Sequence, residues 1–292
     1  MPYATANGVK LYYEEAGRGT PIVFVHEFSG DHRSWEGQIR HFSRRHRCVA
    51  FNARGYPPSE VPASVSSYSW RTAVEDVAVV MRHLSIGKAH IIGCSMGAYA
   101  TLQFGLCHPR RALSLTAVSA GAGSDPSQHA QFIKASEATA RSLLAEGLAP
   151  AMAKYRNAPN RIQLERKDAR AFKEFFERFA EHSPLGHANT LRGVQMRRPT
   201  IYSLRGKLAR LKVPLHVVVG DEDESSLGPG LFLKRACPAA RLTIVPGTGH
   251  VVNVEEPALF NRLTEDFLVL VESGRWQPRD PRSYNPSTMA RK

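Results

Sequence analysis

Cysteine is scarce in this chain of 292 residues, and the few cysteines that occur have no paired spacing. None of them forms a C-x-x-C pair, and each lies among apolar or small residues. A disulfide framework or a zinc site needs several cysteines at short, repeated spacings, so the sequence argues against both. We expect buried free thiols and a reducing compartment. The cysteines are Cys48, Cys94, Cys107 and Cys237.

Long apolar runs are also missing. No segment approaches the roughly 18 apolar residues that a membrane-spanning helix requires. The N-terminal stretch MPYATANGVKLYYEE lacks the basic region followed by an apolar region that marks a secretory signal. We therefore expect a soluble, cytoplasmic protein that does not bind a membrane.

Acidic residues are outnumbered, since 26 Asp and Glu stand against 39 Lys and Arg and leave a formal net charge of +13. Such a surplus attracts anions at long range and permits nonspecific contact with nucleic acid. The sequence has neither zinc-finger spacing nor aromatic residues interleaved with the basic ones. We interpret the surplus as solvated surface charge and expect no nucleic-acid partner. Nothing in the sequence sets the oligomeric state, so a homo-oligomer stays open.

What the chain does contain is an alternation of apolar runs and amphipathic segments. Near-continuous β-branched runs between helical patterns are typical of strands covered on both faces, hence of a mostly parallel sheet. Near the N-terminus, Asn7-Gly8 favours a tight hairpin turn. The predicted fold class is therefore α/β, with a mostly parallel central sheet flanked by helices and an N-terminal β-hairpin. The predicted parallel strands span 22–25, 48–51, 90–92, 113–118, 215–219 and 242–245.

The alternation stops at about 124–211, where the sequence indicates several helices without a strand. Within 169–181, four phenylalanines recur at i, i+3, i+4 and i+7, which favours packing against the main domain over contact with a substrate. We predict an α/β core of residues 1–123 and 212–273 with an inserted helical cap at 124–211. The segment 274–292 is rich in Pro, Arg and Ser, and we predict that it is disordered.

One motif carries most of the chemical information, the G-x-S-x-G at residues 93–97. It follows a predicted strand and precedes a predicted helix over 96–106, which is the context in which this motif presents a nucleophilic serine on a sharp turn. Glycines flank the serine because side chains there would collide with neighbouring backbone. The helix N-terminus also favours negative charge that develops nearby. Ser95 is the predicted nucleophile.

This arrangement resembles the α/β-hydrolase family, and the resemblance covers nearly the whole chain except the tail. The family's catalytic residues follow the order serine, acid, histidine. The G-x-x-D of VVVGDEDESS resembles the family's acid loop and points to Asp223, with Asp221 and Asp125 as substitutes. The segment IVPGTGHVVNVEEP resembles its histidine loop and points to His250. The resemblance implies that His250 is the base and that Asp223 orients it.

The segment HEFSGD resembles the family's H-G-x-x-G oxyanion loop. The resemblance implies that the backbone N–H groups of Phe28 and Met96 bind the oxyanion. Glu27 occupies the family's usual glycine, and a carboxylate that faced the oxyanion would raise the barrier. We therefore expect Glu27 to turn away and to form a structural ion pair with Arg54 of NARGYPPS, in preference to a catalytic role.

A serine nucleophile limits the class of reaction, because family members that open epoxides carry an aspartate where this chain has a serine. The resemblance implies acyl transfer without a metal or organic cofactor. We predict a serine hydrolase that cleaves a small to medium, partly apolar carboxylic ester through an acyl-enzyme, with a small-molecule ester or lactone as its partner. Open alternatives are an enol-lactone or other lactone hydrolase, a C–C bond hydrolase, a perhydrolase, and a noncatalytic ligand-binding receptor on this fold.

Overall fold

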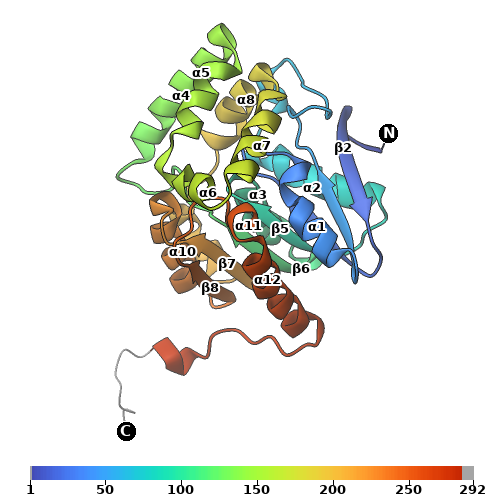
Figure 1. Ribbon diagram of the computed structural model, residues 1–292. Coiled ribbons are helices and arrows are strands. Elements are labelled where there is room, and N and C mark those ends of the chain that lie inside the picture. The colour runs from blue at the N-terminus through green and yellow to red at the C-terminus, as the bar shows by residue number, and fades with distance from the viewer. Residues whose placement is uncertain (1, 285–292) are drawn as a thin grey trace.

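The computed structural model describes residues 2–284, and its centre is an eight-stranded sheet in the order β1-β2-β4-β3-β5-β6-β7-β8. All neighbours from β4 to β8 along this order pair in parallel, whereas β1 with β2 and β2 with β4 are antiparallel. Helices lie on both faces of the sheet (Figure 1). The predicted α/β class is confirmed. The strands are β1 (Tyr3–Ala6), β2 (Val9–Ala16), β3 (Thr20–Val25), β4 (His46–Phe51), β5 (Ala89–Cys94), β6 (Ala112–Val118), β7 (Leu215–Gly220) and β8 (Ala240–Val245).

The hairpin at the N-terminus forms as the sequence predicts. Asn7 and Gly8 have φ angles of 49° and 79°, values that asparagine and glycine tolerate better than other residues. The turn sets Ala6 opposite Val9, and β2 then pairs with β4, so the hairpin extends one edge of the parallel sheet.

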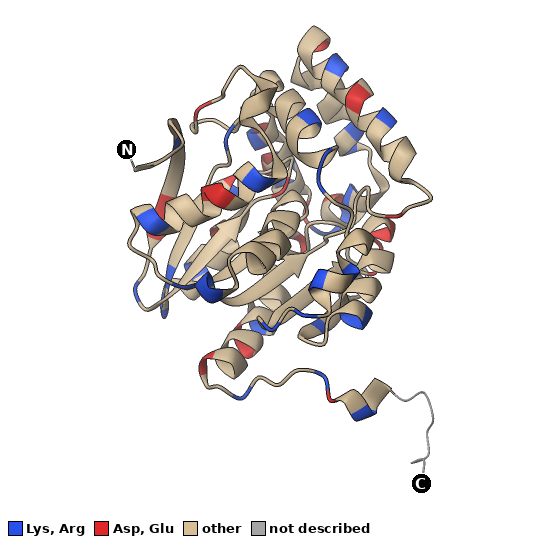
Figure 2. Ribbon diagram, turned by 180° about the vertical axis from the view of Figure 1, so that it is seen from behind, with Lys and Arg blue, Asp and Glu red and all other residues tan. Residues whose placement is uncertain are grey.

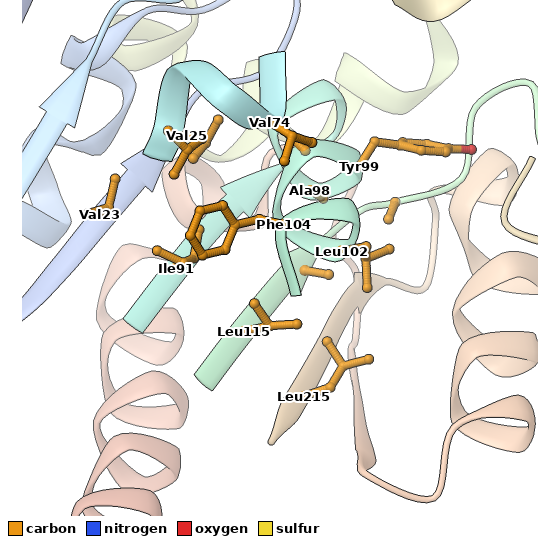
Figure 3. Packing of buried hydrophobic residues seen from close by; sticks show 14 of the residues in the cluster. Val23, Val25, Val74, Ile91, Ala98, Tyr99, Leu102, Phe104, Leu115 and Leu215 are labelled. Atoms are coloured by element: carbon orange, nitrogen blue, oxygen red, sulfur yellow. The ribbon is translucent and has the colours of Figure 1, made fainter. Parts of the chain in front are cut away.

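Two apolar cores form because successive side chains of a strand point to opposite faces. In β3, Val23 and Val25 belong to one core, and Ile22 and Phe24 belong to the other. The first core lies under α2 (Trp70–His83), α3 (Met96–Cys107) and α10 (Glu224–Ala236), and Figure 3 shows part of its packing around α3. The second lies under α1 (Glu36–Phe42) and α12 (Pro257–Glu272).

Between β6 and β7 the described chain is helical. We call α4 to α8 of this stretch the cap, and Figure 1 shows its helices grouped at one end of the sheet. The phenylalanine stripe of α7 is buried in the second core. Its ring contacts, such as that of Phe179 with Tyr155, are with other residues of the helical stretch, so packing against the main domain stays a prediction. The cap helices are α4 (His129–Glu146), α5 (Leu148–Arg156), α6 (Ile162–Lys167), α7 (Ala169–Ala180) and α8 (Pro184–Thr190); a π-helical turn (Leu191–Gln195) and the short α9 (Arg205–Leu208) follow.

The C-terminal segment after α12 has only a short 3₁₀ helix, Pro281–Tyr284, among its described residues. Trp276 packs partly buried against both cores, and the N–H of Arg279 donates to the carbonyl of Pro238 at 2.9 Å. Residues 285–292, on which part of the predicted disorder falls, lie outside the described residues. Disorder of 274–292 stays a prediction.

The structure also bears on the expectations about cysteine burial, surface charge and membrane-spanning helices. The cysteines are free and three are buried, but Cys107 is exposed because it ends α3, so burial was wrongly expected for it. Basic and acidic residues are interspersed over many elements in Figure 2. Within residues 2–284, no helix is both long and apolar enough to cross a membrane.

Candidate active site

Ser95 lies in the sharp turn between β5 and α3. Its φ of 52° and ψ of −109° are strained for a residue with a side chain, and such strain is found mainly where surrounding structure enforces it. The backbone N–H of Ser95 donates to the carbonyl of Val118 at the end of β6, at 2.8 Å. The turn is thus fastened to the neighbouring strand, and Ser95 is only partly buried.

The two glycines of the motif permit close backbone approach. A Cβ on Gly93 would lie 2.3 Å from the carbonyl oxygen of Gly97, and a Cβ on Gly97 would lie 2.1 Å from that of Val25. Both distances are far below contact, so side chains at these positions would push α3 away from β5 and β3. The tight turn therefore depends on glycine at both positions.

His250 and Asp223 meet beyond the ends of β8 and β7. His250 Nδ1 lies 2.6 Å from Asp223 Oδ2, and both side chains are buried. Burial acts to raise the pKa of Asp223, but the His250 ring and hydrogen bonds, including one from Ser225, outweigh it and lower the pKa from 3.8 to about 2. Asp223 is therefore a carboxylate at neutral pH, suited to hold the imidazole N–H.

The histidine loop also contacts the nucleophile turn. The Sγ of Cys94, the residue before Ser95, lies 3.8 Å from the carbonyl oxygen of His250. The predicted nucleophile, acid and base all follow the carboxyl ends of parallel strands, where such sheets bind ligands. The structure thus brings His250 and Asp223 into contact and sets their loop against the turn that holds Ser95.

The two substitute acids have other partners. Asp221 Oδ1 accepts a hydrogen bond from the backbone N–H of Thr248 at 3.2 Å. Asp125 is exposed and accepts from the backbone and hydroxyl of Ser127. Among the described residues, Asp223 is the acid paired with His250.

The proposed oxyanion donors are buried under the cap. Phe28 and Met96 belong to one apolar cluster with cap residues of α4, α5 and α8, including Leu143 and Ala188. The hydroxyl of Tyr56 donates to the carbonyl of Phe28 at 3.0 Å, which fixes the loop. Among residues 2–284, the backbone N–H groups of Phe28 and Met96 donate to no protein acceptor, so both are free for a ligand.

Glu27 packs against the loop that follows it, and whether its carboxylate turns away from the oxyanion donors stays a prediction. Its Oε1 lies 3.5 Å from the hydroxyl of Ser34 and so close to Gly30 that a Cβ there would be 2.2 Å away. Its Oε2 is buried without a hydrogen-bond partner among the described residues. Burial raises the pKa of Glu27, while the charge of Arg161 acts against the rise.

The expected ion pair between Glu27 and Arg54 is wrong. Arg54 instead pairs with Asp76 of α2 through two hydrogen bonds, of 2.8 Å from Nε and 2.7 Å from Nη2. A guanidinium satisfies a carboxylate best with two parallel bonds, and α2 presents Asp76 in that geometry. The cation that faces Glu27 is Arg161 from the cap, whose Nη2 donates to Ser29 Oγ at 3.0 Å.

Sequence reasoning also missed Glu255, which holds the histidine loop. Its buried carboxylate accepts from the backbone N–H of Gly249 at 2.7 Å and of Val251 at 3.1 Å, the two residues that flank His250. Burial raises the pKa of Glu255, and these two N–H donors act against the rise. The pair of glutamates at 255 and 256 gave no signal of which one faces inward.

Among residues 2–284, no group of three or more His, Cys, Asp or Glu side chains could hold a metal ion. His26, beside the oxyanion loop, has its pKa lowered by burial to about 4 and accepts from the N–H of Ala53 at 3.0 Å. It is a neutral, structural histidine.

Known proteins share this architecture. A family model described as the alpha/beta hydrolase fold matches residues 20–257. A putative 2-succinyl-6-hydroxy-2,4-cyclohexadiene-1-carboxylate synthase of Bacillus subtilis (strain 168) is 25% identical, with 91% of this chain and 97% of the relative covered. The 3-oxoadipate enol-lactonase 1 of Acinetobacter baylyi (strain ATCC 33305 / BD413 / ADP1) is 23% identical, with 86% and 89% covered.

Solved structures agree on the fold. The enol-lactonase from Burkholderia xenovorans LB400 superposes with a TM-score of 0.80 at 22% identity, covering 92% of this chain and 100% of that one. A thermophilic esterase from Thermogutta terrifontis gives 0.82 at 22% identity, covering 92% and 98%. Because the family model matches most of the chain from β3 to the start of α12, this protein belongs to the α/β hydrolase fold family.

Proposed function

We propose that this hydrolase uses Ser95, His250 and Asp223 to cleave a small to medium, partly apolar carboxylic ester through an acyl-enzyme. The observation that carries the proposal is the 2.6 Å contact of His250 with Asp223 beside the strained turn of Ser95. A serine hydroxyl is a weak nucleophile unless a base removes its proton, and the base works best when an acid fixes its tautomer.

In the proposed cycle, His250 Nε2 accepts the proton of Ser95 Oγ as that oxygen attacks the ester carbonyl. The backbone N–H groups of Phe28 and Met96 bind the resulting oxyanion. Protonated His250 then gives its proton to the departing alcohol, which leaves an acyl group on Ser95. In the second step His250 takes a proton from water as the water oxygen attacks the acyl carbonyl, and it returns that proton to Ser95 Oγ as the acid is released. Asp223, whose pKa is about 2, stays ionised and stabilises the imidazolium in both steps.

The apolar side chains of the cap favour a substrate with an apolar portion. Phe28 and Met96 pack with cap side chains in a cluster that also includes Tyr56 and Leu143. A roof of this kind excludes water and strengthens the electrostatic interactions beneath it. The expected partner is therefore a small molecule with an apolar part next to the scissile carbonyl.

A lactone is the second candidate substrate. Two similar proteins carry the name enol-lactonase, one from Acinetobacter baylyi (strain ATCC 33305 / BD413 / ADP1) and one from Burkholderia xenovorans LB400. The same steps would open a lactone, except that the leaving alcohol stays attached to the acyl group. A panel of esters and lactones of matched carbon number separates the two by their kcat/KM values.

The proposal is tested by hydrolysis of p-nitrophenyl acetate and butyrate. Wild type should turn over both, and Ser95→Ala should lose the activity while it keeps its melting temperature. Ser127→Ala is the matched control, because it removes an exposed serine hydroxyl outside the site. A fluorophosphonate probe should label wild type at Ser95 alone. A folded protein that resists labelling and hydrolyses neither ester would instead support a noncatalytic receptor.

A further inference from the structure

A short 3₁₀ turn of the cap, Pro159–Arg161, contacts two of the loops that form the proposed site. We call it the cap turn. The backbone N–H of His250 donates to the carbonyl of Asn160 at 3.1 Å. The next residue, Arg161, donates from Nη2 to the hydroxyl oxygen of Ser29 in the oxyanion loop, at 3.0 Å. Two consecutive residues of the cap are therefore bonded to the histidine loop and to the oxyanion loop.

The cap turn lies tightly against the histidine loop. A Cβ on Gly249, the residue before the proposed base, would lie 2.5 Å from the carbonyl oxygen of Asn160, so this close approach depends on glycine. The helix that follows the cap turn, α6, lies beside α11 (Val252–Glu255) (Figure 1). Lys167, the last residue of α6, pairs with Glu256 at 2.6 Å. The cap turn and α6 are thus fastened to the chain on both sides of the histidine.

Arg161 is a buried cation, with 3% of its surface exposed. Its Cζ lies 5.0 Å from the ring centroid of Phe175 in α7, and its Nε and Nη1 have no hydrogen-bond partner among residues 2–284. Burial raises the pKa of Glu27 and the charge of Arg161 opposes this rise, so the buried Glu27 carboxyl lies in the field of the guanidinium. Burying two charged groups is costly and adds little net stability, which favours a role in geometry.

We propose that Arg161 is a positioning residue, which sets the distance between the oxyanion donor Phe28 and the base His250. The inference rests on the proposed hydrolase function. Arg161 holds Ser29, the residue after Phe28, while the carbonyl of Asn160 in the same turn holds the backbone of His250. The donor and the base act on the same tetrahedral intermediate, so a shift of one loop relative to the other should slow the reaction.

The first test removes each end of the bond between Arg161 and Ser29. Ser29→Ala and Arg161→Met should each lower kcat for p-nitrophenyl butyrate by about tenfold or more with little change in KM, because the reacting groups are misplaced while the substrate still binds. Methionine has a similar length and can still cover Phe175, but it cannot donate. Arg156→Met is the matched control and should keep its kcat, because Arg156 also stacks on a phenylalanine of α7, Phe172 at 5.0 Å, but is exposed.

Ser29→Ala also guards against misfolding of Arg161→Met. It removes one buried hydroxyl and keeps the charge of Arg161 beside Glu27, so the fold should persist. Wild-type kcat in either folded variant, or an equal loss in Arg156→Met, would overturn the inference and leave the hydrolase proposal standing.

Gly249→Ala disturbs the cap turn from the opposite side, because the added Cβ would press on the carbonyl of Asn160. If Ser29 and Gly249 act through the same turn, the double variant should lose less in kcat than the product of the two single losses. A loss equal to that product would mean that the two positions act independently, and the proposed link between the loops would be wrong.

Hydrogen exchange measures the link without turnover. In Ser29→Ala and in Arg161→Met, the backbone amides of the histidine loop, 247–252, should exchange about fivefold faster or more than in wild type, although neither substitution lies in that loop. Arg156→Met should leave the exchange unchanged. Unchanged exchange in the first two variants would count against the link, whatever the esterase assay gives. Faster exchange in a protein that hydrolyses no ester would support the link and contradict only the hydrolase proposal.

Discussion

Glu255→Gln tests how the histidine loop is held in place. The carboxylate of Glu255 accepts from the backbone N–H groups on both sides of His250, at 2.7 and 3.1 Å. A glutamine keeps one acceptor oxygen but turns an NH₂ group toward the second N–H. One buried donor then loses its partner, and a hydrogen bond to a charged group contributes about 1.5–3 kcal/mol. We expect the free energy of unfolding to fall by about 2 kcal/mol.

Glu255→Gln should also slow the reaction. The glutamine NH₂ group and the backbone N–H that it faces would repel each other, and the histidine loop would shift to separate them. A misplacement of about 1 Å costs up to about a hundredfold in rate. We expect kcat for p-nitrophenyl butyrate to fall about tenfold or more with little change in KM. Urea unfolding and steady-state kinetics at pH 7.5 measure the two effects.

Glu256→Gln is the matched control. Glu256 is next in the chain but forms a partly exposed ion pair with Lys167 at 2.6 Å, a type that contributes at most about 1 kcal/mol. Unchanged kcat in Glu255→Gln, or an equal loss in both variants, would refute the idea that Glu255 positions the base.

Three further predictions concern the acid, the turn and pH. Asp223→Asn should lower kcat for p-nitrophenyl esters by about 10⁴, because the imidazole loses its oriented tautomer, and wild-type kinetics in this variant would contradict its role. Gly97→Ala should lower the free energy of unfolding by about 1–3 kcal/mol, because its Cβ would lie 2.1 Å from the Val25 carbonyl. Gly87→Ala, where the added Cβ meets nothing within 4 Å, should change the free energy of unfolding little. Equal losses of stability for the two variants in urea would refute the steric argument. Burial lowers the pKa of His216 from 6.5 to about 4, so the unfolded chain takes up the proton first as pH falls. His216 should thus reduce stability by about 2 kcal/mol between pH 7 and 5, and His216→Gln should flatten that slope in urea titrations.

The sequence predicted most of the fold because the relevant signals are local. Apolar runs at 22–25 and 48–51 became β3 and β4, and Asn7-Gly8 formed the hairpin turn. The five residues around Ser95 predicted its turn, since backbone strain and glycine spacing act over a few positions. Asp223 and His250 could be named only through their resemblance to a family, and the structure then brought the two side chains together.

Long-range partners of charged side chains were the part that local patterns could not supply. Arg54 pairs with Asp76 instead of Glu27, and Arg161 reaches the oxyanion loop from the cap. Composition does not indicate which of the 39 Lys and Arg residues lies next to Glu27. Which one does depends on how the cap docks on the sheet.

By itself, therefore, the sequence determined the order of strands and helices, the hairpin and the strained serine turn, because hydrophobic periodicity and glycine placement act on neighbouring residues. Only the tertiary structure decided that Glu255 holds the histidine loop and that Arg161 bonds to Ser29 of the oxyanion loop. Burial and pairing of a charge depend on groups that are distant in the chain and are brought together when the cap and the sheet pack.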